Sequence, residues 1–122
     1  MDKNTVRCAD ETYECEHLII CTGSQTVIPP IQGIDQVSYW THRDALDNKE
    51  LPRSLAIVGG GVIGMEFASF FSSLGVQVTV IEMMNEILNG IDRELAASLR
   101  TEYSKKGVKF LLGAKVTSSF TG

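Results

Sequence analysis

A glycine-rich turn between an apolar segment and a helix-like segment constrains this chain most strongly. Gly59, Gly61 and Gly64 form a GxGxxG pattern, which follows apolar residues 55–58 and opens residues 62–74, where apolar side chains recur at helical spacing. Gly59 permits a tight turn, the missing side chain of Gly61 lets the backbone approach a pyrophosphate, and Gly64 lets the helix lie close to the strand. The pattern therefore predicts the start of a dinucleotide-binding βαβ unit.

The N-terminus of the expected helix completes the predicted phosphate site. Gly60 lies inside the turn, and Val62 and Ile63 begin the helix, whose free N–H groups and partial positive charge favour a phosphate ligand. We therefore include these three residues among the candidate cofactor-binding residues.

Glu82 is the second half of the signal. It ends the expected strand 76–81, close to the roughly 20 residues past the first glycine at which a ribose-binding acid is expected. A carboxylate there can accept both ribose hydroxyls of NAD and repels the 2′-phosphate of NADP, and residues 83–85 contain no arginine to receive that phosphate. The chain is expected to prefer NAD. The plainer alternative is a βαβ turn that binds no phosphate and carries an exposed glutamate.

The whole chain divides into three stretches. Residues 1–30 form a strand segment, residues 31–52 a connector with a short helix after Thr41, and residues 53–122 an α/β unit. In the first stretch we expect strands at 5–8 and 12–15 and a buried strand at 17–21. In the third we expect strands at 55–58, 76–81 and 108–112, helices at 62–74 and 92–105, and the start of a further strand at 115–117. The predicted fold class is a Rossmann-like βαβαβ parallel sheet with right-handed crossovers, preceded by a short β segment.

The first helix and the connector carry more specific expectations. Side chains at helical spacing mark the apolar face of the helix, namely Ile63, Phe67, Phe70, Phe71 and Leu74. Thr41 and Asp92 are expected to be N-caps, Leu51-Pro52 to end the connector helix, and Gly107 to end the second helix of the α/β unit.

Composition excludes several function classes. The net charge of −4 gives no basic footprint for nucleic acid. No apolar run approaches the roughly 20 residues that span a bilayer, and the start of the chain lacks a signal-peptide pattern, so a cytoplasmic location is expected. The spacing of Cys8, Cys15 and Cys21 fits neither a CxxC pair nor a zinc site, and we expect inert, partly buried thiols rather than a redox pair. His17 and His42 have no companions at metal-ligand spacing.

The sequence resembles a known family. Residues 57–68 (IVGGGVIGMEFA) and 78–82 (VTVIE) are similar to the NAD domain of the dihydrolipoamide dehydrogenases, within the flavin-dependent pyridine nucleotide–disulfide oxidoreductases. The similarity continues through residues 87–92, 106–110 and 113–117. Upstream, residues 18–24 (LIICTGS) resemble the strand with an Ala-Thr-Gly motif that closes part of the family's FAD domain, with Cys21 in place of the usual alanine.

The resemblance assigns roles to further residues. Thr22, Gly23 and Ser24 match the motif on the FAD side, and Val116 matches a position that packs near the adenine. Glu66 is the only charged residue between Gly59 and Ile81. From the residues alone it belongs on a solvent-exposed helix face, whereas the matching family position pairs with a flavin-side lysine.

The resemblance also implies the parent's activity. The family's FAD-binding βαβ unit, CxxxxC redox disulfide and C-terminal interface domain find no match in this chain. NAD(H) is the expected ligand, FAD belongs only to the intact parent, and the parent's reaction is hydride transfer between FAD and NAD coupled to dithiol/disulfide exchange. We assign this chain no catalytic residue and expect it to be inactive alone.

The alternative functions are those of another family member (mercuric reductase, NADH peroxidase or a soluble transhydrogenase) and of a standalone nucleotide-binding module. The expected protein partner is the rest of the parent chain. Without it, the chain is expected to self-associate through the apolar strand 18–21 or to behave as a loose monomer.

Overall fold

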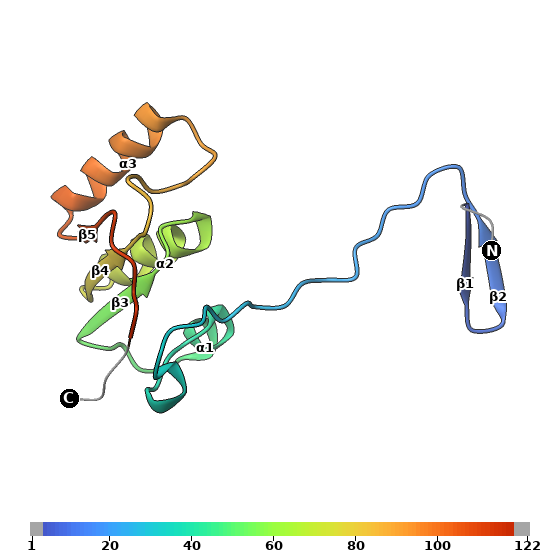
Figure 1. Cartoon of the computed structure of the whole chain (residues 1–122), viewed down its shortest axis with the longest axis horizontal. Helices are drawn as coiled ribbons and strands as arrows, with labels where there is room; N and C mark the ends of the chain where they lie inside the picture. Colours follow the sequence, from blue (N-terminus) through green and yellow to red (C-terminus); the bar gives the residue numbers. More distant parts are fainter. Residues whose placement is uncertain (1–3, 119–122) are drawn as a thin grey trace.

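The computed structural model describes residues 4–118. Figure 1 shows an α/β unit joined by a long extended segment to a distant hairpin. The elements follow one another as β1 (Thr5–Cys8), β2 (Glu11–Glu14), the 3-10 turn η1 (Ile34–Gln36), α1 (His42–Asp47), β3 (Ser54–Val58), α2 (Val62–Ser73), β4 (Gln77–Ile81), α3 (Arg93–Lys105) and β5 (Lys109–Leu111).

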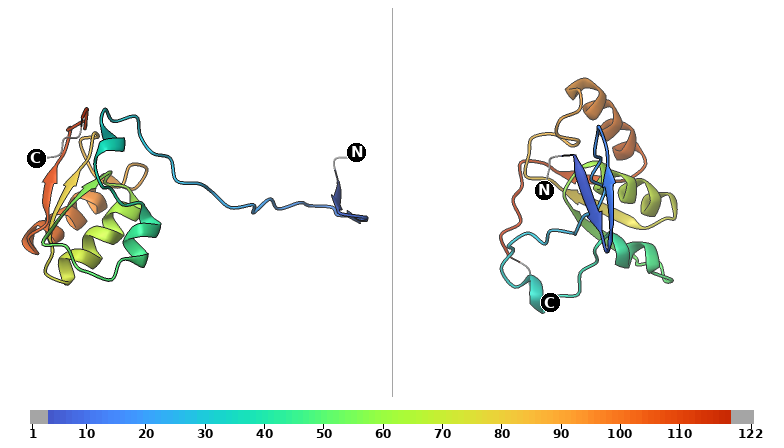
Figure 2. Two further views of the ribbon diagram at one scale, coloured as in Figure 1. Left: turned by 90° about the horizontal axis from the view of Figure 1, so that it is seen from below. Right: turned by 90° about the vertical axis from the view of Figure 1, so that its right-hand side faces the viewer.

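The α/β unit is a three-stranded parallel sheet in the order β3-β4-β5. Val58 lies opposite Ile81, and Ile81 lies opposite Leu111, so the three strands end at one edge. Helix α2 connects β3 to β4, and helix α3 connects β4 to β5. Figure 2 shows both helices against one face of the sheet. This arrangement is the one expected of two right-handed crossovers made in the same direction. The predicted βαβαβ parallel sheet is confirmed.

The core lies between this face of the sheet and the two helices. In β4, alternate residues Val78 and Val80 are buried, as the two-residue period of a strand requires. Side chains from both helices and from the loops beside them close the core over β4, namely Met65, Ala68, Phe71, Val76, Ile87, Ala96 and Val108.

The helix predicted at 62–74 is present as α2, but only Phe67 and Phe71 of its expected apolar face pack in the core. Ile63 and Phe70 are 60% and 56% exposed, and Leu74 is also exposed, whereas Phe71 is buried. The buried stripe instead runs through Met65, Ala68 and Phe71, with spacings of three residues. Ala68 is fully buried, and Phe71 on the same side of the helix is one of the largest fully buried side chains. This orientation leaves Ile63, Phe70 and Leu74 exposed.

The helix ends follow from local hydrogen bonds. The Thr41 N–H donates a 2.7 Å bond to Asp44 Oδ2 at the start of α1, as expected of this cap. Asp92 Oδ1 accepts from the N–H groups of Glu94 and Leu95 at the start of α3, which confirms that N-cap. Helix α1 ends at Asp47, earlier than the Leu51-Pro52 pair predicted.

The N-terminal stretch matches the predictions only in part. Strands β1 and β2 form the expected antiparallel hairpin, with the turn at Ala9 and Asp10. The buried strand predicted at 17–21 was wrong, because these residues are extended outside any strand, with Leu18, Ile19 and Ile20 exposed by 52%, 83% and 74%. Within residues 4–118 no strand lies beside them to complete a ladder.

Two smaller expectations also need correction. Cys8 and Cys21 are exposed and Cys15 is half-buried, so partial burial holds for Cys15 alone. Residues 115–117 form no strand, and the contact there is an isolated parallel bridge between Gln32 and Ser118.

None of the helices within residues 4–118 has both the length and the hydropathy needed to cross a bilayer.

Candidate functional site

The glycine turn lies where β3 passes into α2. Gly59 has φ of 110°, a conformation that side chains strongly disfavour, and its N–H donates a 2.9 Å bond to the Ile81 carbonyl of β4. Gly61 is the N-cap of α2, and its carbonyl accepts the first helical bond from Met65 N–H at 2.9 Å. The chain therefore turns tightly at the edge where the parallel strands end.

Gly64 brings the first turn of α2 against the end of the strand. A Cβ atom added at Gly64 would lie 2.1 Å from the Gly59 carbonyl oxygen and 3.4 Å from Ile57 Cγ2. No side chain fits at such a distance. The close packing of helix on strand expected of Gly64 is thus present.

Gly61, by contrast, faces open space. A Cβ atom added there would have no atom within 4 Å apart from its chain neighbours. The first N–H groups of a helix have no intrahelical acceptor, and here those of Val62, Ile63 and Gly64 belong to the first turn of α2. Val62 and Ile63 are exposed. An anion could therefore approach the backbone and the positive end of the helix dipole without displacing a side chain.

Glu82 follows β4 and lies beside this turn. Its Oε2 accepts a 2.6 Å bond from Gly60 N–H, and its Oε1 accepts a 2.7 Å bond from Met84 N–H. The residue is half-buried, whereas Met83 and Met84 are exposed. A carboxylate has about four acceptor positions, so these two bonds fix its orientation and leave positions for further donors. The structure therefore brings together the predicted acid and the predicted glycine turn.

The loop between β4 and α3 supports the glycine turn. The sequence did not reveal this contact. Leu88 N–H donates a 2.8 Å bond to the Gly60 carbonyl, and the Ile87 side chain is buried against Gly60. Leu88 has φ of 54°, which is uncommon for a residue other than glycine. The adjacent apolar residues Ile87 and Leu88 in this loop were the available signal.

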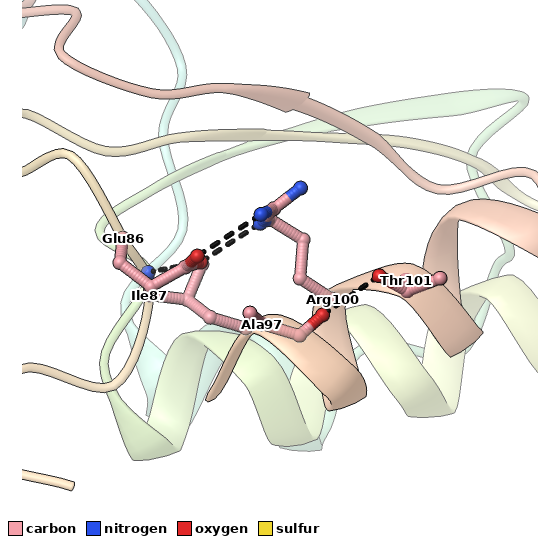
Figure 3. A network of polar contacts seen from close by, with 5 residues as sticks. All are labelled: Glu86, Ile87, Ala97, Arg100 and Thr101. Carbon is pink, nitrogen blue, oxygen red and sulfur yellow. Dashed lines mark hydrogen bonds and ion pairs between the residues drawn. The ribbon is translucent and has the colours of Figure 1, made fainter. Parts of the chain in front are cut away.

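An ion pair anchors the same loop to α3. Arg100 Nε lies 2.8 Å from Glu86 Oε1, and Arg100 Nη2 lies 3.0 Å from Glu86 Oε2 (Figure 3). The hydrogen bonds from Arg100 hold the pKa of Glu86 below its ordinary value, and Glu86 in turn raises the pKa of Arg100. Fourteen residues separate the partners, so sequence spacing gave no hint of the pair.

The other predicted residues lie outside the hydrogen-bonded pair of turn and acid. Glu66 is exposed on α2, at an open hollow of about 560 Å³ between α2 and α3 that Met65, Phe70 and Tyr103 also line. Val116 is half-buried in the segment after β5, where Ala114 N–H donates a 3.0 Å bond to the Glu82 carbonyl. The predicted FAD-side residues, Thr22, Gly23 and Ser24, are exposed in the extended segment that leads away from the α/β unit (Figure 1).

Comparisons with known proteins show the family of this chain. The family model described as pyridine nucleotide-disulphide oxidoreductase matches residues 1–121. A dihydrolipoyl dehydrogenase from Rhizobium etli is 43% identical over 106 residues, which cover 87% of this chain and 22% of that protein. The chain therefore spans about a fifth of the length of this relative.

Solved structures have a similar fold. The Cu(II) complex of the HOCl-induced flavoprotein disulfide reductase RclA from Escherichia coli superposes with a TM-score of 0.76 at 38% identity, covering 94% of this chain and 27% of that one. A water-forming NADH oxidase from Lactobacillus brevis, bound to NADH, superposes with a TM-score of 0.71 at 31% identity, covering 92% of this chain and 26% of that one.

Proposed function

The chain belongs to the pyridine nucleotide-disulphide oxidoreductase family, and from this premise we propose that the unit beginning at residue 53 binds NAD(H). The observation that carries the proposal is the hydrogen bond from Gly60 N–H to Glu82 Oε2, which joins the candidate phosphate turn to the candidate ribose acid. The solved NADH oxidase that resembles this chain is bound to NADH, which supports the same ligand here.

Each part of the site suits one part of the nucleotide. The open space at Gly61 and the first N–H groups of α2 would receive the pyrophosphate. The unoccupied acceptor positions of Glu82 would receive the two hydroxyls of the adenosine ribose. Val116, two residues beyond the Ala114 bond to Glu82, would lie near the adenine.

The same arrangement favours NAD over NADP. A 2′-phosphate would replace a hydroxyl donor of the ribose and place negative charge beside the Glu82 carboxylate. The two backbone bonds to Gly60 and Met84 hold this carboxylate in place, so it cannot easily turn away. Residues 83–85 supply no cation to compensate.

We propose that the intact parent is a dihydrolipoamide dehydrogenase-like flavoprotein, in which NAD supplies the hydride-accepting chemistry when bound. The 43% identity to the Rhizobium etli enzyme supports this choice within the family. The role of this chain is binding and orientation, since within residues 4–118 we assign no nucleophile or electron carrier. FAD, for which Thr22, Gly23 and Ser24 are the candidate contacts, and the dithiol chemistry would involve the rest of the parent chain, and Glu66 would face that part.

Calorimetric titration with NAD⁺ and NADP⁺ tests the proposal. The wild-type chain should bind NAD⁺ at least about tenfold more tightly than NADP⁺, which corresponds to 1.4 kcal/mol. Glu82→Ala should weaken NAD⁺ binding and remove most of this preference, whereas Glu14→Ala, which deletes the same charge from the distant hairpin, should change neither. Equal affinities in the wild type would overturn the role of Glu82, and binding of neither nucleotide would overturn the site.

A further inference from the structure

We propose that Arg100 and Glu86 are positioning residues of the nucleotide site, whose ion pair holds the loop between β4 and α3 against the Gly60 peptide. The inference rests on the proposed function, because it concerns the same site. It adds two residues that lie outside the glycine pattern and that contact the site only through other residues.

The pair has the geometry of a structural clamp. The guanidinium of Arg100 makes two hydrogen bonds to the two oxygens of Glu86, a fork that lysine cannot reproduce. The side chains of Arg100 and Glu86 are 31% and 16% exposed, so solvent screens the pair less than it screens a surface pair. Figure 3 shows Arg100 extending from α3 to the loop residue.

A continuous series of contacts leads from this pair to the turn. Glu86 Oε1 also accepts a 3.0 Å bond from Ile87 N–H, which fixes the peptide that follows the ion pair. Ile87 is 1% exposed, and its Cγ2 would lie 3.0 Å from a Cβ atom placed on Gly60. The next residue, Leu88, donates its N–H to the Gly60 carbonyl at 2.8 Å.

Gly60 passes this restraint to the acid. Its carbonyl is held by Leu88, while its N–H is held by Glu82 at 2.6 Å. A shift of the loop would therefore move the phosphate turn and release the ribose acid together. Leu88 keeps its uncommon φ of 54° only while its surroundings hold it, and the ion pair is one of those restraints.

Helix α3 also offers a matched control. Lys105 Nζ lies 2.7 Å from Glu102 Oε1, an ion pair three residues apart on the same helix. Its side chains are 66% and 58% exposed, and both partners lie on α3. Lys105→Gln therefore removes one positive charge and one ion pair from α3 without releasing the loop.

The experiment compares Arg100→Gln, Glu86→Gln, their double variant and Arg100→Lys with the Lys105→Gln control. NADH dissociation constants are measured below the unfolding midpoint of every variant, so that all remain folded. Each glutamine variant should bind NADH roughly tenfold more weakly, within the range expected of coupled neighbours. The double variant should bind no worse than either single one, Arg100→Lys should fall in between, and Lys105→Gln should match the wild type.

A second readout does not need the nucleotide. The backbone amide proton resonances of Gly60 and Met84 report their bonds to Glu82, and both should move in Arg100→Gln but not in Lys105→Gln. Equal NADH affinity in these two variants, or unmoved resonances, would overturn the proposal. If the wild type does not bind NADH, the proposed function fails, and the resonances alone support or overturn the positioning role. If Arg100→Gln does not fold, Arg100→Lys provides the same comparison.

Discussion

The Gly60 N–H donates a 2.6 Å hydrogen bond to Oε2 of Glu82, across the gap between the β3–α2 turn and the end of β4. Two residues far apart in the sequence are thereby joined at the edge where parallel strands end. In open α/β sheets, ligands bind beyond this edge. The bond fixes the spacing between the proposed phosphate turn and the proposed ribose acid before a nucleotide arrives, which should lower the cost of binding.

Gly61→Val should abolish NADH binding while largely sparing the fold. Gly61 has φ of −73°, which valine can adopt, and no atom lies within 4 Å of an added Cβ. The free energy of unfolding should change by less than about 1 kcal/mol, as for most substitutions with room to spare. Calorimetric titration with NADH tests the loss of binding, and urea unfolding tests the free energy of unfolding. Wild-type affinity in a folded variant would show that phosphates do not approach this turn.

Gly64→Ala should have the opposite profile and damage stability first. Its Cβ would lie 2.1 Å from the Gly59 carbonyl oxygen, so α2 would have to move away from β3. Overpacking of this kind costs about 1–3 kcal/mol. The urea midpoint should fall accordingly, with Gly61→Ala as the control that adds the same methyl group to open space. Equal midpoints for the two variants would contradict the packing described here.

Acid should weaken the fold partly through Glu86. The hydrogen bonds from Arg100 lower its pKa from the ordinary 4.5, so the carboxylate contributes stability above about 4.5, and this contribution is lost as the pH falls through the lowered pKa. Urea unfolding between pH 7 and pH 3 should show this loss in the wild type and a smaller one in Glu86→Gln. Because Asp44 and Glu102 also have lowered pKa values, the difference between the two proteins is the informative quantity. Parallel curves would mean that Glu86 contributes nothing.

The exposed segment at Leu18, Ile19 and Ile20 should make the chain self-associate. Within residues 4–118, β3 pairs on one side only, so an apolar extended segment from a second copy can add to its free edge. Light scattering should show growth in mass with concentration. Ile19→Lys should shift the population towards monomer, whereas Val27→Lys, at an equally exposed position outside the segment, should not. A wild type that stays monomeric at every concentration would refute the idea.

Much of the α/β unit could be predicted from the sequence because local signals agreed there. The glycine turn, the Asp92 cap and the alternation in β4 each specify an element without reference to distant residues. The proximity of Glu82 to Gly60 also followed, since parallel strands β3 and β4 end together.

The failures concern contacts that depend on the tertiary structure. A strand at 17–21 needs a neighbouring edge, and an apolar run does not show whether one is available. The buried side of α2 runs through Met65, Ala68 and Phe71, and the apolar spacing of the helix did not distinguish this side from the exposed one. The Glu86–Arg100 pair joins a loop to a helix across 14 residues, a distance at which no local spacing rule applies.

Backbone amide resonances of the isotope-labelled chain, recorded during titration with NAD⁺, test the central claim most directly. The account predicts the largest changes at Gly59 to Gly64 and at Glu82 and Met84, with the β1–β2 hairpin unaffected. Absence of changes at the glycine turn, or changes concentrated at the hollow lined by Phe70 and Tyr103, would contradict it.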